Sequence, residues 1–385
     1  MNTDGSSDSC RALEHATGGY FISGNDIDVL RNGEEIFPAM LEAITEARQT
    51  IDLATYVYWT GAIADRFAKT LAARAREGVK VRVLLDAFGA KPMALKLREE
   101  MAEAGVEVRW FRPLSTWRFW RTDKRMHRKI LICDGSLGFT GGVGIADEWE
   151  GDARNPDEWR DTHIALRGPL TSALAAAFLD NWYEAGEWSR ATPAGDARES
   201  RGDISAMVLR SSTSIAWNDI ATALRCMIAN ADSHICITTA YFNPDATLVE
   251  LLLHAHRRGV KVQLLLPGEH TDSRLSQLAG QPALEPLLQE GVNVWLYQKT
   301  MLHAKIMTVD GHLSCVGSAN FNHRSLMKDE ECCLIIDDVS IAAELDRDFQ
   351  HDCDGALKVD PASWTTRGAG LRLQEYLARL IQEQL

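Results

Sequence analysis

The chain has 385 residues, of which 45% are hydrophobic and 25% are charged, and this balance excludes a protein that is disordered throughout. The formal net charge is −13, whereas a protein that coats nucleic acid usually carries a broad basic surplus. The length predicts two or three domains, or two halves that share one large core.

The chain begins with a polar stretch, MNTDGSSDSCRALEH, that has no apolar signal core, so residues 1–18 are expected to form a disordered arm. No window approaches the roughly 18 consecutive apolar residues that a membrane-spanning helix needs. The eight cysteines form no C-x-x-C pair, and several lie in apolar runs such as ILICDG and ECCLII. We expect buried, reduced thiols and a cytoplasmic protein, with no zinc site.

Strands and helices alternate through the first half. TIDLATYVYW is rich in β-branched and aromatic residues and predicts a strand, and the amphipathic IADRFAKTLAARAREG predicts a helix that Gly78 ends. VKVRVLLDAFG predicts a strand that is buried on both faces. A helix ending at Gly105, a strand VEVRWF, and the segments HRKILICDG and LGFTGG follow.

The second half repeats this order of elements. Its segments are SHICITTAYF, ATLVELLLHAHRRG, VKVQLLLPG, PALEPLLQEG, VNVWLY, HAKIMTVDG and SCVGSAN. A polar stretch at 191–204 predicts a linker between a first domain at 19–190 and a second at 205–385. The pattern predicts an α/β fold in which two homologous α/β/α sandwich halves pack about a pseudo-two-fold axis, with equivalent loops face to face.

Each half contains one copy of the motif His-x-Lys-x4-Asp. The two copies consist of His127, Lys129 and Asp134, and of His303, Lys305 and Asp310. Residues i and i+2 of a strand share a face, so each His and Lys should project together. A lysine can hold the anionic oxygens of a phosphate while a histidine attacks phosphorus or transfers a proton. One copy alone suits a surface strand with a stray histidine, but two copies at equivalent positions predict one catalytic site.

Small-residue loops follow both motifs, Gly141-Gly142-Val143-Gly144 in the first half and Gly317-Ser318-Ala319-Asn320 in the second. Such loops let backbone N–H groups approach phosphate oxygens, and Ser318 and Asn320 can add side-chain donors. We therefore predict phosphate contacts from Ser318, Asn320 and Gly142. Both motif aspartates come at strand ends before glycine, where a structural turn or a salt bridge is as reasonable a role as direct chemistry.

The doubled motif and the GSAN loop resemble the phospholipase D superfamily, over nearly the whole chain from about residue 20. TAYFNPD at 239–245 and EWRDTH at 158–163 look most like its bacterial cardiolipin synthase branch. The resemblance implies a phosphatidyltransferase that forms cardiolipin or a related phospholipid from phosphatidylglycerol through a phosphohistidine, without a metal or other cofactor. Alternatives are a phospholipase D that releases phosphatidic acid, a nucleic-acid phosphodiesterase, and a catalytically idle lipid-binding scaffold.

The resemblance also implies roles for individual residues. His127 would be the nucleophile and His303 the general acid and base, while Lys129 and Lys305 would bind the phosphate and stabilise the transition state. Each histidine needs a carboxylate that fixes its tautomer. The implied partners are Asp161 for His127 and Glu330 for His303.

Two segments suggest contact with a membrane surface. RPLSTWRFWRTDKRMHRK, just before the first motif, is basic and aromatic, and Trp117, Arg118, Trp120 and Arg121 are predicted to dock on lipid; a core-packing turn or a nucleic-acid contact are the alternatives. The final segment, LRLQEYLARLIQEQL, predicts a helix that packs on a domain, with surface anchoring as the alternative. We expect peripheral association with the inner (plasma) membrane and no stable nucleic-acid partner, and the oligomeric state stays open.

Overall fold

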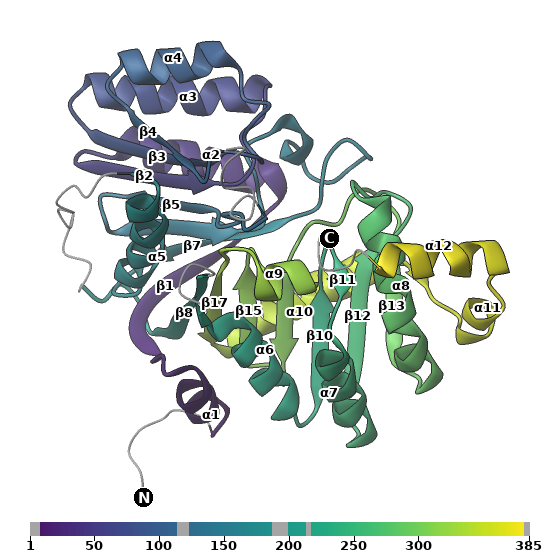
Figure 1. Cartoon of the computed structure of the whole chain (residues 1–385). Helices are drawn as coiled ribbons and strands as arrows, with labels where there is room; N and C mark the ends of the chain where they lie inside the picture. The colour runs from purple at the N-terminus through teal and green to yellow at the C-terminus, as the bar shows by residue number, and fades with distance from the viewer. Residues whose placement is uncertain (1–7, 114–122, 187–198, 213–216, 381–385) are drawn as a thin grey trace, which may run out of the picture.

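The computed structural model describes residues 8–113, 123–186, 199–212 and 217–380 (Figure 1). The first half contains, in chain order, α1 (Asp8–Thr17), β1 (Ile22–Arg31), α2 (Asn32–Glu46), β2 (Thr50–Thr55), α3 (Ala62–Arg76), β3 (Lys80–Asp86), α4 (Leu95–Glu103), β4 (Glu107–Phe111), β5 (Ile130–Cys133), β6 (Leu137–Gly141), the 3₁₀ turn η2 (Asp147–Trp149), β7 (Thr162–Arg167) and α5 (Thr171–Glu184).

The second half repeats the same order of strands and helices. It contains β8 (Ile204–Ser212), β9 (Trp217–Asn218), α6 (Asp219–Ala229), β10 (His234–Thr238), β11 (Phe242–Asn243), α7 (Ala246–Arg257), β12 (Lys261–Pro267), α8 (Arg274–Gln289), β13 (Asn293–Tyr297), β14 (Ile306–Val309), β15 (Leu313–Gly317), β16 (Phe321–Asn322), α9 (His323–Met327), β17 (Cys332–Asp337), α10 (Val339–Asp354), β18 (Leu357–Lys358), α11 (Pro361–Thr365) and α12 (Ala369–Arg379). Every strand and helix predicted in the two repeats is present, although most are a few residues shorter than the sequence patterns.

One continuous mixed sheet runs through both halves. Its strand order is β18-β13-β12-β10-β14-β15-β17-β8-β1-β7-β6-β5-β2-β3-β4, which reads as one strand series and its mirror image about the β8–β1 pair, with β18 added at one edge. The β8–β1 pair is antiparallel and joins the halves. This arrangement confirms two homologous α/β halves related by a pseudo-two-fold axis, and it brings the ends of β5 and β14 toward each other.

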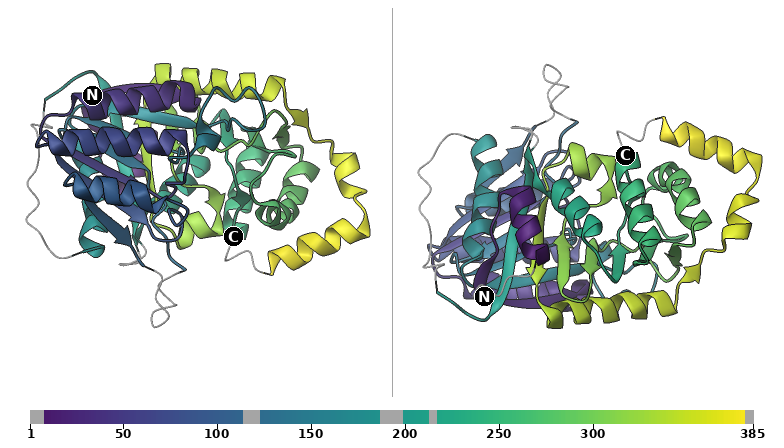
Figure 2. Two further views of the ribbon diagram at one scale, coloured as in Figure 1. Left: turned by 90° about the horizontal axis from the view of Figure 1, so that it is seen from above. Right: turned by 90° about the horizontal axis from the view of Figure 1, so that it is seen from below.

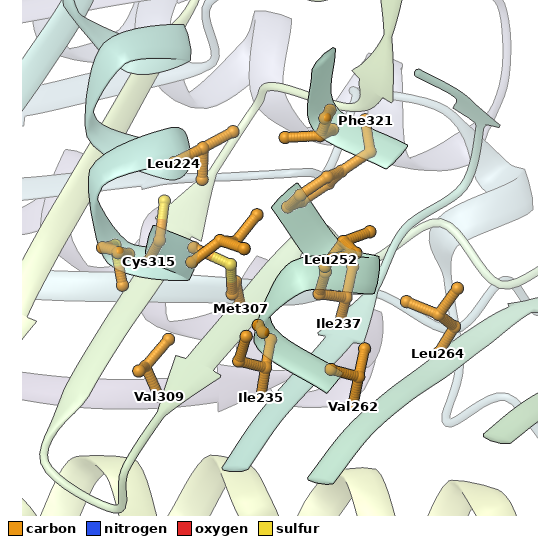
Figure 3. Packing of buried hydrophobic residues seen from close by; sticks show 14 of the residues in the cluster. Leu224, Ile235, Ile237, Leu252, Val262, Leu264, Met307, Val309, Cys315 and Phe321 are labelled. Atoms are coloured by element: carbon orange, nitrogen blue, oxygen red, sulfur yellow. The ribbon is translucent and has the colours of Figure 1, made fainter. Parts of the chain in front are cut away.

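Helices cover both faces of the sheet in each half (Figure 1). In the second half, alternate residues of β10, β12 and β14 bury their side chains against α6 and α7 (Figure 3). The side chains shown there include Ile235, Ile237, Val262, Leu264, Met307 and Val309. The opposite face packs on α10, so these strands are buried on both sides, as their continuous apolar runs predict.

Residues Asp8–Thr17 form helix α1, so the predicted disordered arm at 1–18 is wrong for this part of it. Cys10 and Leu13 lie one helical turn apart on α1 and are buried against the core of the second half, next to α6. The apolar positions i and i+3 that drive this packing were visible in the sequence but are too few to predict a helix. Most of the predicted linker at 191–204 lies outside the described residues.

Among the described residues, none of the helices combines the length and the apolar character that crossing a membrane requires.

Candidate active site

The two motif histidines lie just before β5 and β14, on extended stretches rather than inside the strands that the motifs predicted. The backbone of each stretch is hydrogen-bonded to the other half of the chain. His127 N donates to Glu330 O over 2.9 Å, and His303 N donates to Arg160 O over 2.7 Å. The two catalytic segments are therefore anchored across the interface between the halves, which brings residues about 176 positions apart in sequence to one place.

A buried carboxylate holds each histidine, and in both cases it comes from the opposite half. His127 Nδ1 lies 2.9 Å from Glu331 Oε1, and His303 Nδ1 lies 2.7 Å from Asp161 Oδ2. The expected pairing of Asp161 with His127 is wrong, because Asp161 orients the histidine of the other motif. Since Nδ1 donates its proton to the carboxylate, Nε2 of each ring is left for chemistry.

Glu330, the residue predicted to orient His303, has a different role. Its fully buried carboxylate pairs with Arg112 over 3.2 Å and with Arg128 over 3.4 Å. Its neighbour Glu331 is the carboxylate that reaches a histidine, and that histidine is His127. The physical reason is alternation along the chain: adjacent residues point to opposite sides, so Glu331 faces the site and Glu330 faces the charged contacts behind it.

Burial and the neighbouring charges together set the protonation states of the site. Burial lowers the pKa of His303 to about 4, and it also lowers the pKa of His127. Burial alone would raise the pKa of Asp161 and of Glu331, but the neighbouring histidines and lysines outweigh it and lower both values. At neutral pH, two neutral imidazoles are thus held by two ionised carboxylates.

The motif lysines lie beside their histidines. Lys129 Nζ donates to the carbonyl oxygen of His127 over 2.8 Å, and Lys305 Nζ contacts both the carbonyl oxygen and Nδ1 of His303. Burial lowers the pKa of Lys129 to about 7 and that of Lys305 to about 8. An arriving phosphate anion favours the charged form of both amines, so each is placed to become its counter-ion.

Both histidines open onto one cavity of about 580 Å³ between the halves, with Lys129 and Asn320 also in its wall. The two motifs can act on one phosphate only if both histidines face the same cavity, and they do.

The wall of this cavity differs at its two symmetry-related ends. His303 lies against tryptophans, with ring centroids 5.1 Å from Trp149 and 5.5 Å from Trp159. Trp149 Nε1 also donates to Asp161 over 2.8 Å. Near His127 the wall instead contains Tyr56, whose ring centroid is 5.1 Å away, and Asp329, whose pKa burial raises to about 7. These four residues and Glu331 are part of the site, but the sequence motifs did not predict them.

Gly142 and Ser318 occupy equivalent positions in the two repeats. Each lies next to the carboxylate that binds a catalytic histidine, Asp161 for Gly142 and Glu331 for Ser318. A Cβ atom on Gly142 would come within 2.1 Å of Asp161 Oδ1, so only glycine leaves room for that side chain. Ser318 Oγ donates to Glu331 Oε2 over 2.5 Å and accepts from Cys332 N over 3.0 Å. Of the three predicted phosphate contacts, Asn320 is the one in the cavity wall. The GGVG and GSAN loops thus differ because their carboxylates need different support.

The motif aspartates are turn residues, at the ends of β5 and β14 remote from the histidines. Asp134 and Asp310 have left-handed φ angles of 52° and 53° and precede glycines that are also left-handed, as in the tight Asp-Gly turns of hairpins. Their carboxylates accept backbone N–H groups that enter the neighbouring strand: those of Arg48, Gln49 and Thr50 for Asp134, and of Asp232, Ser233 and His234 for Asp310. Direct catalytic roles for them are wrong.

Replacing Asp310 by alanine is expected to lower the free energy of unfolding by about 2–4 kcal/mol, because three N–H donors lose a charged acceptor and alanine disfavours the left-handed backbone. The backbone donors lower the pKa of Asp310 although burial opposes them, so this contribution should vanish as pH falls through the folded-state pKa. Urea unfolding at pH 7 and at pH 3 measures both effects. Asp310→Asn tolerates the same φ and should lose less; an unaltered unfolding midpoint in Asp310→Ala would contradict the turn role.

Residues 114–122 of the basic and aromatic segment predicted to touch a membrane lie outside the described residues, and Trp117, Arg118, Trp120 and Arg121 are among them.

Comparison with known proteins agrees with this site. The family described as "Cardiolipin synthase, PLD-like domain" matches residues 40–148 and 224–353, which include both motifs. The major cardiolipin synthase ClsA of Bacillus subtilis (strain 168) is 31% identical over 369 residues, covering 94% of this chain and 76% of that protein. Cardiolipin synthase 1 of Bacillus cereus is 30% identical over 380 residues, covering 96% and 74%.

A solved structure shares the fold. Phosphatidylserine synthase of Haemophilus influenzae Rd KW20 superposes with a TM-score of 0.76 at 14% identity, covering 98% of this chain and 100% of that one. The sequence matches extend over both halves and both motifs. The chain therefore belongs to the phospholipase D superfamily, in its bacterial cardiolipin synthase-like branch, and is a phosphatidyltransferase of that type that acts on phospholipid.

Proposed function

We propose that this phosphatidyltransferase forms cardiolipin or a closely related phospholipid by moving a phosphatidyl group from one phosphatidylglycerol molecule to a hydroxyl of a second. The observation that carries the proposal is the pair of imidazoles from different halves, each bound at Nδ1 to a buried carboxylate and both facing one cavity. The two sequence relatives reported above are both named cardiolipin synthases, which supports the choice of substrate.

In the first step, Nε2 of His127 attacks phosphorus and the bond from phosphorus to the glycerol oxygen breaks. Protonated His303 gives its proton to that oxygen, and glycerol leaves. Burial lowers the pKa of His303 to about 4, but a phosphate anion beside it favours the imidazolium, so binding of the substrate prepares the acid. Lys129, Lys305 and Asn320 hold the phosphate oxygens, with no metal in the scheme.

In the second step, His303 takes the proton from a hydroxyl of the acceptor lipid, whose oxygen attacks phosphorus. The phosphorus–nitrogen bond to His127 breaks and the histidine becomes neutral again. Burial favours the neutral histidine, so His127 is a good leaving group when the phosphorus–nitrogen bond of the intermediate breaks. The tryptophans around His303 shield this end of the cavity and limit the access of water, which would otherwise replace the acceptor.

Incubating the purified full chain with labelled phosphatidylglycerol is expected to yield cardiolipin and free glycerol in equal amounts, separated by thin-layer chromatography. Phosphatidic acid as the sole product would instead identify a phospholipase D. Cleavage of single-stranded DNA without any lipid turnover would identify a nucleic-acid phosphodiesterase. His127→Ala serves as the blank in each arm.

We propose further that the enzyme works on the cytoplasmic side of the inner membrane as a peripheral protein. All eight cysteines lie in the part of the chain that the structure describes; none of them forms a disulfide and seven are buried, which suits a reducing compartment. The phosphatidyl group that it transfers carries two acyl chains, so the cavity must open toward lipid during turnover.

A further inference from the structure

Helix α12 has an apolar stripe on each of two opposite sides. Leu371 and Ala378 face the body of the protein and pack on Leu278 and Ala279 of α8, which confirms the predicted packing role of this helix. Between them, Glu375 is buried and pairs with Arg367 over 2.6 Å. The outward side carries a second stripe at the spacing i, i+3, i+4, i+7, with exposed fractions of 54% to 66%: Leu373, Tyr376, Leu377 and Leu380.

This outward stripe is unusual for a helix on a protein surface. Such a helix normally turns one apolar side inward and a charged side to water. Here the residues opposite the packed side are apolar, and the basic residues Arg372 and Arg379 are exposed along one flank of the stripe. An apolar stripe with a cationic flank is the pattern of helices that lie in the headgroup region of a bilayer with anionic lipids.

Helix α12, which carries the stripe, lies close to the active-site cavity. α12 packs on the first turns of α8, and Ser273 and Ser276 at that same end of α8 line the cavity. α12 lies beside α8 in Figure 1, and the two views of Figure 2 place it on the side of the second half opposite to α10. The helix that carries the stripe is therefore packed on the same end of α8 that borders the cavity.

Exposed apolar side chains also border the mouth itself. Phe88 lines the cavity and is 57% exposed. Leu275 is exposed between the two cavity-lining serines of α8, and Met327 is exposed at the end of α9, whose Arg324 and Ser325 line the cavity. The turn after β3, helix α8 and helix α9, which come from both halves, thus each present a large apolar side chain to solvent around one opening.

We propose that the outward stripe of α12, with the apolar residues at the cavity mouth, is the surface that docks this enzyme on a phospholipid bilayer. The inference rests on the proposed function, in which the donor and acceptor keep their acyl chains in lipid while the phosphate enters the cavity. Insertion of the stripe to the depth of the acyl boundary sets the mouth against the membrane. The flanking arginines face anionic headgroups, a charge match that a second copy of this acidic chain, with net charge −13, offers less well.

The test replaces Leu373 and Leu377 together by glutamine, which keeps helix propensity and removes the apolar surface. Co-sedimentation with vesicles of equal parts phosphatidylglycerol and phosphatidylcholine is expected to show binding weakened about tenfold or more, because two leucines no longer enter an apolar phase. Turnover of phosphatidylglycerol in vesicles should fall in parallel. Turnover of monomeric, short-chain phosphatidylglycerol should stay within about twofold of the unaltered enzyme.

The matched control is the pair Val339→Gln and Leu357→Gln, which removes two exposed apolar side chains from α10 and β18 and should leave vesicle binding unchanged. Equal vesicle binding by both double variants overturns the proposal, as does absence of vesicle binding by the unaltered protein. A change from dimer to monomer in the α12 variant with intact vesicle binding also overturns it, and identifies a self-association surface. Failure of the proposed function appears separately, as absent turnover of the short-chain lipid.

Discussion

The His127→Gln variant is expected to lose at least about a thousandfold in the rate of phosphatidyl transfer, because it removes the proposed nucleophile that forms the covalent bond to phosphorus. Glutamine is close in size, keeps a polar atom near Glu331 and cannot attack phosphorus. The His303→Gln variant should lose a similar factor on phosphatidylglycerol, since glycerol is a poor leaving group that needs a proton.

A donor with a good leaving group separates the two roles. Phosphatidyl-p-nitrophenol releases p-nitrophenolate without protonation, so His303→Gln should still give a burst of one equivalent and then stall, because no base activates the acceptor. Acid-labile labelling of the stalled protein, located by peptide mapping, should fall on His127. His127→Gln should give no burst. A burst in His127→Gln and its absence in His303→Gln would show that the roles are reversed, and equal loss of both bursts would refute the two-step scheme.

Much of this molecule follows from its sequence because the repeat doubles every signal. The alternating strand and helix patterns predict the elements of each half, and the β8–β1 junction preserves their order as a mirror image. The two His-x-Lys pairs are equivalent in the repeat, so a two-fold arrangement brings them to one place. The motif aspartates could also have been assigned, since an Asp-Gly pair between two short apolar runs predicts a hairpin turn with a left-handed residue.

The pairing of the carboxylates with the histidines could not be predicted from the sequence in the same way. A sequence places Asp161 near the first motif and the pair Glu330 and Glu331 near the second, and proximity along the chain suggests pairing within each half. The pairing is instead decided at the interface, where backbone bonds from Arg160 to Met301 and from Glu330 to Arg125 bring each carboxylate beside the other half's histidine. One signal was available: Asp161 and Glu331 each directly precede their strand, β7 and β17, so the repeat itself selects Glu331 over Glu330.

The internal repeat does not predict that the cavity wall near His303 differs from the wall near His127. Trp159 and Asp329 stand two residues before Asp161 and Glu331, in equivalent places, yet one is aromatic and the other ionisable. An internal repeat predicts what the halves share, and a duplicated enzyme that must distinguish donor from acceptor has to differ at such positions. Only the packed structure shows that both residues face one cavity.

Each catalytic histidine is paired with a carboxylate of the opposite half, so removing one carboxylate should slow only the step that its histidine performs. Glu331→Gln is expected to slow the burst with phosphatidyl-p-nitrophenol by about 10²–10⁴, because it removes the charge that fixes the tautomer of His127. Asp161→Asn should leave the burst nearly intact and slow the later turnover by a similar factor, because its partner is His303. Stopped-flow release of p-nitrophenolate measures both phases in one experiment, and thermal unfolding checks that each variant is folded.

Double variants test whether each carboxylate acts through the histidine of the opposite half, and this test does not depend on absolute rates. Groups that act as one unit are not additive, so Asp161→Asn should cost little in the His303→Gln background, where its histidine is already gone. Glu331→Gln in that background should still slow the burst, since His127 remains dependent on it. If Asp161→Asn slowed the burst and Glu331→Gln spared it, each histidine would be served by the carboxylate of its own half, and the contacts across the pseudo-two-fold axis would have no part in orienting the catalytic rings.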